Sequence, residues 1–232
     1  MITTNIISRT FLISVNDDTG SCFSFEHQDK QYLVTAKHVL DSIDFVCGDR
    51  IQIKIFHDEH WKLLNCLIYI HKESEIDIAV LKTETKFSAL PVSAGIDNII
   101  FGGDVYFLGF PYGMFTSFSE GELNQKFPVP FVKKGILSAI ISKYDITSLY
   151  IDAHNNKGFS GGPVITTNNK GEIKIIGVNV SYLKHENTID VEEQDDDGYL
   201  FKKQFEYFEN SGIMEVQSIN HVKQIIESIH KE

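Results

Sequence analysis

Short apolar and alternating segments recur along most of this chain, and they constrain its fold more than any other feature. Residues 51–55 read Ile-Gln-Ile-Lys-Ile, with an apolar side chain at every second position, as in a strand with one buried face. Further strand candidates are residues 67–70, 78–81, 105–110, 135–141, 149–152 and 173–180. The segment Asn168-Asn169-Lys170-Gly171 predicts a hairpin turn. Short strands at this spacing are typical of β-barrels and β-sandwiches.

The end of the chain follows a different period. Apolar residues recur there at three- and four-residue intervals, which places them on one face of a helix. They are Ile219, Val222, Ile225, Ile226 and Ile229. Ser218 precedes them, and serine is a favoured helix N-cap. We therefore predict an all-β chain with one C-terminal α-helix at about 218–230.

The composition agrees with a globular protein. The chain has 232 residues, of which 42% are hydrophobic and 23% charged, enough for the core of one or two small β domains. Its net charge of −11 argues against nucleic acid as a partner, because phosphate binding depends on Lys and Arg. No apolar run approaches the roughly 20 residues of a membrane span, so we expect no membrane partner either.

Two features bear on the cellular compartment. The first 20 residues lack a basic region followed by an apolar core, so no secretory signal is evident, although a chain trimmed of its signal would look the same. Cys22, Cys47 and Cys66 are odd in number and show no pattern of a disulfide scaffold. We expect a cytoplasmic protein with reduced, partly buried thiols. A redox or modification role for Cys22 is the weaker alternative to core packing.

Residues 158–164 read Gly-Phe-Ser-Gly-Gly-Pro-Val, a pattern that suits a nucleophile. Glycines on both sides of Ser160 permit a tight turn, and such a turn can aim backbone N–H groups at one point beside the hydroxyl. Acyl transfer needs that combination of nucleophile and oxyanion donors. By itself the segment could also be a glycine-rich hairpin.

Two other segments supply a base and an acid. Residues 32–40 contain a strand-like run that ends at His38, and Asp77 opens the apolar run 78–81. Taken singly, such a histidine is usually part of a core or an edge, and such an aspartate is usually a turn residue. The combination of His, Asp and Ser, each set against a strand, is what favours nucleophilic catalysis.

These segments carry a family resemblance. Residues 35–39 (Thr-Ala-Lys-His-Val), 77–81 (Asp-Ile-Ala-Val-Leu) and 158–163 (Gly-Phe-Ser-Gly-Gly-Pro) resemble the three catalytic motifs of trypsin-like (chymotrypsin-fold) serine proteases, most closely the bacterial HtrA-type branch. Weaker similarities lie at 20–23, 109–113, 134–139 and 176–179. The matches are in the same order as in the family, the resemblance extends from about Gly20 to His230, and we expect no PDZ domain.

The resemblance implies a fold and a mechanism. It implies two six-stranded antiparallel β-barrels, with residues 1–95 carrying His38 and Asp77 and residues 96–232 carrying Ser160, and the active site between them. His38 is then the general base, Asp77 its orienting acid and Ser160 the nucleophile. The N–H groups of Gly158 and Ser160 are then the oxyanion hole. The reaction needs no metal or organic cofactor.

Phe159 departs from trypsin in an informative way. Trypsin has an aspartate there, which pairs with a freed N-terminus when the zymogen is cleaved, and a phenyl ring cannot make that ion pair. Activation by insertion of a new N-terminus is therefore not expected.

Substrate preference is predicted from the cleft walls that the resemblance implies. His154 precedes the nucleophile turn at about the position of the trypsin pocket aspartate, and a surface-loop residue is the plainer alternative for it. Val178, Val180 and Tyr182 would form the opposite wall and pair with the substrate as an added strand. An apolar or small residue before the cleaved bond is the expected preference.

Two segments, one acidic and one with two histidines, could be interpreted as metal-binding sites, but neither matches the corresponding metal-binding motif. Glu193, Asp195, Asp197 and Gly198 resemble part of a calcium loop, but the first ligand is not Asp and position 204 is Gln. We expect residues 186–198 to form a solvated acidic loop. Residues 57–60 (His-Asp-Glu-His) follow an alternating strand into a turn and lack the zinc motif His-Glu-x-x-His.

Three functional hypotheses follow. The leading one is a serine endopeptidase that acts on a protein or peptide substrate. The second is an inactive trypsin-like binding scaffold. The third is a regulatory or defence-associated protease whose activity depends on a protein activator.

Overall fold

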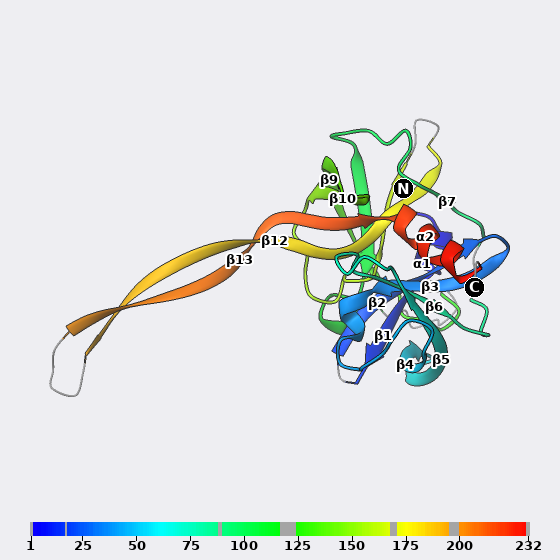
Figure 1. Ribbon diagram of the computed structural model, residues 1–232, viewed down its shortest axis with the longest axis horizontal. Coiled ribbons are helices and arrows are strands. Elements are labelled where there is room, and N and C mark those ends of the chain that lie inside the picture. Colours follow the sequence, from blue (N-terminus) through cyan, green and yellow to red (C-terminus); the bar gives the residue numbers. More distant parts are fainter. Residues whose placement is uncertain are drawn as a thin grey trace.

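The computed structural model describes residues 2–16, 18–87, 90–116, 124–167, 171–194 and 200–230 of the chain. Two β-structures pack side by side, and a long two-stranded ribbon projects from one of them (Figure 1). The predicted all-β architecture with a C-terminal helix is confirmed.

The first structure is a closed six-stranded antiparallel barrel in the order β1-β2-β3-β6-β5-β4. Its strands are β1 (Thr10–Val15), β2 (Asp18–His27), β3 (Lys30–Ala36), β4 (Arg50–His57), β5 (His60–Ile70) and β6 (Ile78–Lys82). The alternation at residues 51–55 turns Ile51, Ile53 and Ile55 into the core. His57 pairs with His60 across a two-residue hairpin in which Asp58 and Glu59 both have positive φ. The segment predicted as a turn is therefore a turn.

The second structure is a seven-stranded sheet in the order β11-β8-β9-β10-β13-β12-β7. Its strands are β7 (Ser93–Ala94), β8 (Asp104–Gly109), β9 (Phe131–Lys143), β10 (Ile146–Asp152), β11 (Pro163–Thr167), β12 (Ile173–Gln194) and β13 (Leu200–Ser218). An additional β11–β12 pairing closes six of these strands into the second barrel. The short β7 joins the edge of this sheet in parallel with β12. Residues 168–170 of the predicted hairpin lie outside the described residues.

The strands β12 and β13 extend far beyond the second barrel. The pairing of β12 with β11 ends at Val178, and that of β13 with β10 begins at Ile213, whereas β12 and β13 pair with each other out to Gln194 and Leu200. The result is the ribbon that projects from the body in Figure 1. The expected acidic loop is therefore wrong for residues 186–194, which are strand, because cross-strand pairing outweighs their polar composition. Asp195, Asp197 and Gly198 of the weighed calcium pattern lie outside the described residues.

Helix α2 (Ile219–Ile229) confirms the C-terminal prediction. Its Ser218 Oγ accepts a hydrogen bond from the Asn220 N–H at 3.2 Å. The apolar stripe of α2 is buried in a hydrophobic cluster that consists mostly of first-barrel residues and also includes residues of β12 in the second. An additional short helix, α1 (Thr4–Ile7), was not predicted. Among the described residues, neither helix has the length and apolar character needed to cross a bilayer.

Candidate active site

His38 lies where a buried strand ends and a 3₁₀ turn, η1 (Lys37–Leu40), begins. Its backbone N–H donates to Asp77 Oδ1 at 2.9 Å, and its ring Nδ1 lies 2.6 Å from Asp77 Oδ2. Asp77 immediately precedes β6, which pairs with β3. The carboxylate therefore holds the Nδ1 side of the ring, which leaves Nε2 for a reacting group.

The environment of His38 favours its charged form. Partial burial by itself lowers the pKa of His38, but the hydrogen bond and charge of Asp77, with a smaller contribution from Asp41, raise it above the ordinary value. Asp77 is therefore placed to stabilise an imidazolium once His38 has taken a proton.

Asp77 is held in turn by a residue of the other barrel. Gln217 on β13 accepts the Asp77 N–H at Oε1 (2.7 Å) and donates from Nε2 to the Glu75 carbonyl (2.8 Å). The Gln217 side chain is buried. Sequence reasoning missed this residue, because a glutamine within a strand carries no motif.

Ser160 lies in a tight turn that only glycine permits on either side. Gly158 and Gly161 have φ values of +99° and +83°. A Cβ at Gly158 would come within 2.2 Å of the Phe110 carbonyl, and a Cβ at Gly161 within 2.1 Å of the Ser21 carbonyl. The backbone of the nucleophile turn therefore packs directly against both barrels.

The turn leaves two backbone donors unused. The Lys157 carbonyl accepts from the Tyr112 N–H at 2.8 Å. Because the N–H of Gly158 belongs to the same trans peptide unit, it points the opposite way. Within the described part of the chain, neither the Gly158 N–H nor the Ser160 N–H donates to a protein acceptor.

Ser21 ties the first barrel to this turn. Its buried hydroxyl donates to the Gly158 carbonyl (2.7 Å) and accepts from the Phe110 N–H (3.1 Å). Its backbone N–H donates to the Ser160 carbonyl at 2.9 Å. The sequence signal was present in residues 20–23, but it indicated only the family and not this contact.

The buried side chain of Phe159 holds the nucleophile turn in place. Its ring is fully buried, and its centroid lies 5.1 Å from that of Phe107. Lys133 Nζ lies 5.7 Å from both ring centroids. The same ammonium donates to Asn156 Oδ1 at 3.0 Å and to the His154 carbonyl, and desolvation lowers the pKa of Lys133. The turn is therefore held by an aromatic contact and a cation–π contact.

The candidate residues of both barrels meet in a cleft of about 600 Å³. His38, Asp77 and Ser160 line it, together with Tyr112, His154, Asn155, Asn156, Lys157, Val180, Ser181, Tyr182 and Asn210. Val178 does not reach the cleft, because its side chain is buried in the core. Both His38 and Ser160 are among the described residues, and no hydrogen bond joins their side chains.

The two walls of the cleft are joined by a buried amide pair. Asn155 and Asn179 exchange hydrogen bonds through their side chains, each at 3.0 Å. Asn155 also donates to the Ser181 carbonyl at 3.1 Å and accepts from the Asn210 side chain through its own carbonyl. These bonds fix the loop before the nucleophile against the start of the ribbon.

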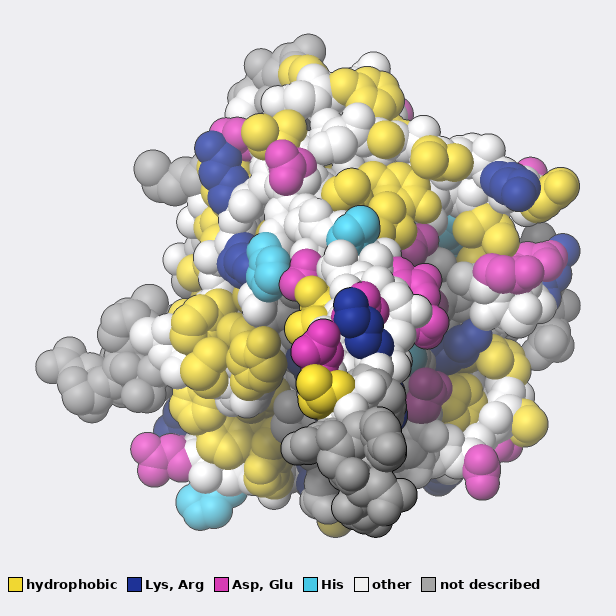
Figure 2. Space-filling view, turned by 90° about the vertical axis from the view of Figure 1, so that its left-hand side faces the viewer, with side chains coloured by type: hydrophobic (Ala, Val, Ile, Leu, Met, Phe, Trp, Pro, Cys, Tyr) yellow, Lys and Arg dark blue, Asp and Glu magenta, His cyan; other side chains and the backbone are white. Residues whose placement is uncertain are grey.

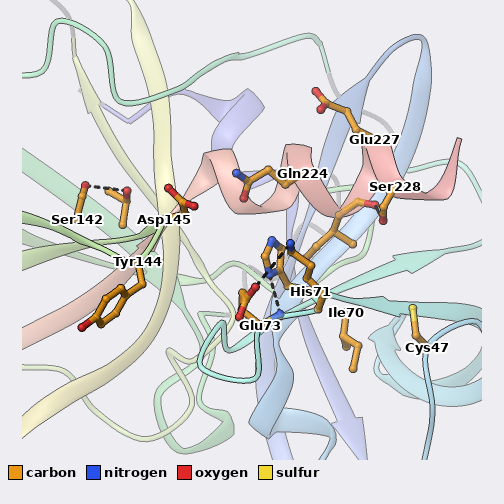
Figure 3. A pocket seen from close by; sticks show the side chains of 13 residues that line it. Cys47, Ile70, His71, Glu73, Ser142, Tyr144, Asp145, Gln224, Glu227 and Ser228 are labelled. Atoms are coloured by element: carbon orange, nitrogen blue, oxygen red, sulfur yellow. Dashed lines mark hydrogen bonds and ion pairs between the residues drawn. The ribbon is translucent and has the colours of Figure 1, made fainter. Parts of the chain in front are cut away.

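A second cavity of about 1180 Å³ lies away from the catalytic residues, between the end of β5, the turn after β9 and helix α2 (Figure 3). His71 Nδ1 accepts from the Glu73 N–H there at 3.1 Å, and burial and the adjacent His221 lower the pKa of His71. Of the described lining residues, none belongs to the His38, Asp77 and Ser160 set. We therefore place the candidate active site in the smaller cleft.

The described residues contain no group of three or more His, Cys, Asp or Glu side chains arranged for a metal ion. Cys22 and Cys66 are buried, and Cys47 is exposed. Burial, with the neighbouring Cys66, raises the pKa of Cys22 well above its ordinary value. A thiolate at Cys22 is thereby disfavoured, which argues for core packing over a redox role.

Comparison with known proteins agrees with this geometry. A family model described as a trypsin-like peptidase domain matches residues 20–178. A search of curated protein sequences finds no match.

Several solved structures share the fold. An inactive serine-to-alanine mutant form of Rv3671c from M. tuberculosis H37Rv is similar at 14% identity and a TM-score of 0.60, over 97% of this chain and 88% of that one. The HtrA-type protease AlgW with a tripeptide is similar at 19% identity and a TM-score of 0.61, over 97% of this chain and 61% of that one.

Proposed function

Because the chain belongs to the trypsin-like peptidase family, we propose that it is a serine endopeptidase in which Ser160, His38 and Asp77 form the catalytic triad. One observation carries this proposal. The hydrogen-bonded His38–Asp77 pair and the glycine-flanked Ser160 come from different barrels and line one cleft.

The proposed reaction proceeds through an acyl-enzyme. His38 Nε2 takes the proton of the Ser160 hydroxyl as Oγ attacks the peptide carbonyl, and the protonated ring then gives that proton to the leaving amine. Water attacks the ester in the second half, again with His38 as base. Asp77 keeps Nδ1 protonated and stabilises the imidazolium, consistent with the raised pKa of His38.

The free N–H groups of Gly158 and Ser160 support an oxyanion hole in the proposed mechanism. Both lack a protein acceptor among the described residues, so both are free to bind the negative oxygen of the tetrahedral intermediate. The loss of one such donor typically costs about 3–4 kcal/mol of transition-state stabilisation. We expect the contacts of Ser21 and Lys133, which set this turn, to matter for rate.

We propose that the substrate is a peptide segment with an apolar or small residue before the cleaved bond. His154 lines the cleft without a negative charge, so nothing at this position selects Lys or Arg. Val180 and Tyr182 lie on the opposite wall and are placed to bind the substrate as an added strand.

Covalent labelling with a fluorophosphonate probe tests the proposal. We expect the purified wild-type protein to be labelled, and the Ser160→Ala and His38→Ala variants not to be labelled. Persistent labelling of Ser160→Ala would remove Ser160 from its assigned role. An absence of wild-type labelling under all conditions would support the inactive binding scaffold.

A partner-gated protease is the second candidate. It is favoured by the missing hydrogen bond between Ser160 and His38 in this structure, although such bonds often tighten only when substrate binds. Labelling that requires an added protein partner would support gating.

A further inference from the structure

The ribbon consists of residues 183–194 of β12 and 200–210 of β13, which pair with each other outside the second barrel. Among the described residues, no third strand pairs with either of its outer edges. A two-stranded hairpin is marginally stable in water, and a long open strand edge readily pairs with another chain. The outer edges of the ribbon are therefore available for pairing with an added strand.

The β12 edge of the ribbon is continuous with the candidate substrate cleft. On the edge away from β13, Asn179 accepts from the Gly161 N–H at 2.7 Å and donates to the Gly162 carbonyl at 3.0 Å. Those glycines directly follow Ser160. The next residues of β12, from Val180 to Tyr182, line the cleft, and the ribbon begins immediately after them. The pairing of β12 with β13 shifts register after Asn179 and again after Tyr182, but β12 remains one strand from Ile173 to Gln194. Its outer edge therefore leads from Ser160 onto the ribbon.

The cross-strand register gives the ribbon two different faces. Ile189 lies opposite Phe205, and Asn187 lies opposite Tyr207, so these pairs share one face with Val191. The apolar side chains on it are well exposed: Ile189 by 53%, Val191 by 37%, Phe205 by 40% and Tyr207 by 43%. The same face also carries Lys203, opposite Val191, and the pair His185 and Glu209. Its middle part therefore offers hydrophobic contacts to an added strand.

The opposite face carries more acidic than basic side chains. It holds Glu186, Asp190, Glu192 and Glu206 together with Lys184 and Lys202, and also Phe208, which lies opposite Glu186 and is 62% exposed. Figure 2 looks at the molecule from the outer end of the ribbon and shows acidic, lysine and hydrophobic side chains close together there. Alternate residues of an added strand would lie over each face in turn.

We propose that the free edge of β12 from Val180 to Glu193 binds the part of the substrate that precedes the cleaved bond, as a third, antiparallel strand. An antiparallel strand runs inward along the ribbon, so its carboxyl end reaches Ser160. The substrate is then an extended segment in which apolar residues alternate with Lys or Arg. This inference rests on the proposed peptidase function, and it extends substrate recognition well beyond the cleft.

A binding experiment with the Ser160→Ala protein tests the inference without requiring catalysis. The probe is a fluorescein-labelled peptide with twelve residues of alternating valine and lysine, followed by Ala-Ala-Val-Ala. The control peptide has the same composition with the alternation broken. We expect fluorescence anisotropy to show at least about tenfold tighter binding of the alternating peptide, which corresponds to about 1.4 kcal/mol. Equal binding of the two peptides would overturn the proposal.

Substitutions then locate the binding edge. Ile189→Lys places a charge on the apolar face of the ribbon, and Ile141→Lys is the matched control, since Ile141 on β9 is 52% exposed. We expect Ile189→Lys, and Phe205→Lys as a second variant, to weaken binding about tenfold or more, while Ile141→Lys does not. Circular dichroism checks that each variant is folded. Unchanged affinity in both ribbon variants would overturn the proposal.

Two further readouts separate this inference from its alternatives. Sedimentation of the Ser160→Ala protein that shows a dimer abolished by Ile189→Lys would assign the edge to a second copy instead. Fluorophosphonate labelling of the wild type reports on the peptidase independently. Labelling without peptide binding contradicts only the ribbon proposal, and peptide binding without labelling contradicts only the peptidase.

Discussion

At the scale of single residues, the candidate chemistry depends on how each side chain is held. Asp77 fixes one nitrogen of His38, Ser21 fixes the carbonyl of Gly158, and Lys133 contacts the loop just before the nucleophile. Several of these contacts involve charged groups, whose hydrogen bonds are stronger than neutral ones.

The pH dependence of kcat/KM reports on His38. The base must be neutral to act, so activity is lost as the pH falls through the pKa of His38. Because Asp77 and Asp41 raise that pKa, we expect the acid limb to lie above the ordinary histidine value of about 6.5. Asp41→Asn removes a negative charge and should move the limb to lower pH. The matched control Asp44→Asn, in the same exposed segment, should leave it in place.

Lys133→Met should slow the chemical step. The variant keeps an apolar stem but loses the donors to His154 and Asn156 and the cation above Phe107 and Phe159. We expect kcat to fall about tenfold, equivalent to about 1.4 kcal/mol, with a smaller change in KM and partial recovery in Lys133→Arg. Lys134→Met is the control, because Lys134 makes an exposed ion pair with Asp104. Equal kinetics in Lys133→Met and wild type would contradict this role.

At the scale of elements, strand β13 has two tasks. Its outer part builds the ribbon, and its inner part carries Gln217, which holds the segment from Glu75 to Asp77 in the first barrel. Strand β13 therefore connects the ribbon, whose β12 edge is the proposed substrate site, to the acid of the proposed triad.

Gln217→Leu should impair both stability and activity. The substitution leaves the Asp77 N–H and the Glu75 carbonyl without their partner, which costs about 1–3 kcal/mol of unfolding free energy. We also expect a lower kcat and an acid limb moved to lower pH, because a less firmly held Asp77 raises the pKa of His38 less. Urea unfolding and kinetics check this. Gln52→Leu, at an exposed glutamine, should change neither measurement.

At the scale of the whole molecule, the site depends on how the two barrels pack. Ser160 belongs to the second barrel and His38 to the first, so a small displacement between the barrels changes their separation, and misplacement of a base costs rate steeply. Helix α2 follows the last strand of the second barrel and packs against β5 and β6 of the first barrel as well as β12 of the second. It therefore ties the two barrels together.

Ile226→Ala should destabilise the whole molecule. Ile226 is fully buried in the core that α2 shares with the first barrel. Its truncation should lower the free energy of unfolding by about 2–5 kcal/mol and reduce activity at temperatures where the wild type is stable. Ile141→Ala, at an exposed position on β9, is the control. Equal denaturation midpoints in the two variants would contradict this contribution.

Much of the fold followed from local patterns. Alternating apolar residues predicted the strands, such as Ile51 to Ile55, and an apolar stripe behind Ser218 predicted α2. The residue types and order of His38, Asp77 and Ser160 indicated a triad. Each of these signals is contained in a few neighbouring residues, because strand, helix and turn preferences are local.

Other features were decided by the tertiary structure alone. The acidic segment from Glu186 to Glu193 is a strand because β13 pairs with it, and Val178 points into the core rather than the cleft. Gln217 and Lys133 acquired their contacts from residues far away in the sequence.

The physical reason is the range of the interactions involved. Local residue patterns are enough to specify which segments form strands, a helix and the nucleophile turn, since those depend on neighbouring residues. The contacts that hold the nucleophile turn, the residues that line the cleft and the position of the β12 edge beside Ser160 depend on the packing of the two barrels. Those contacts join distant parts of the chain, so local patterns do not reveal them.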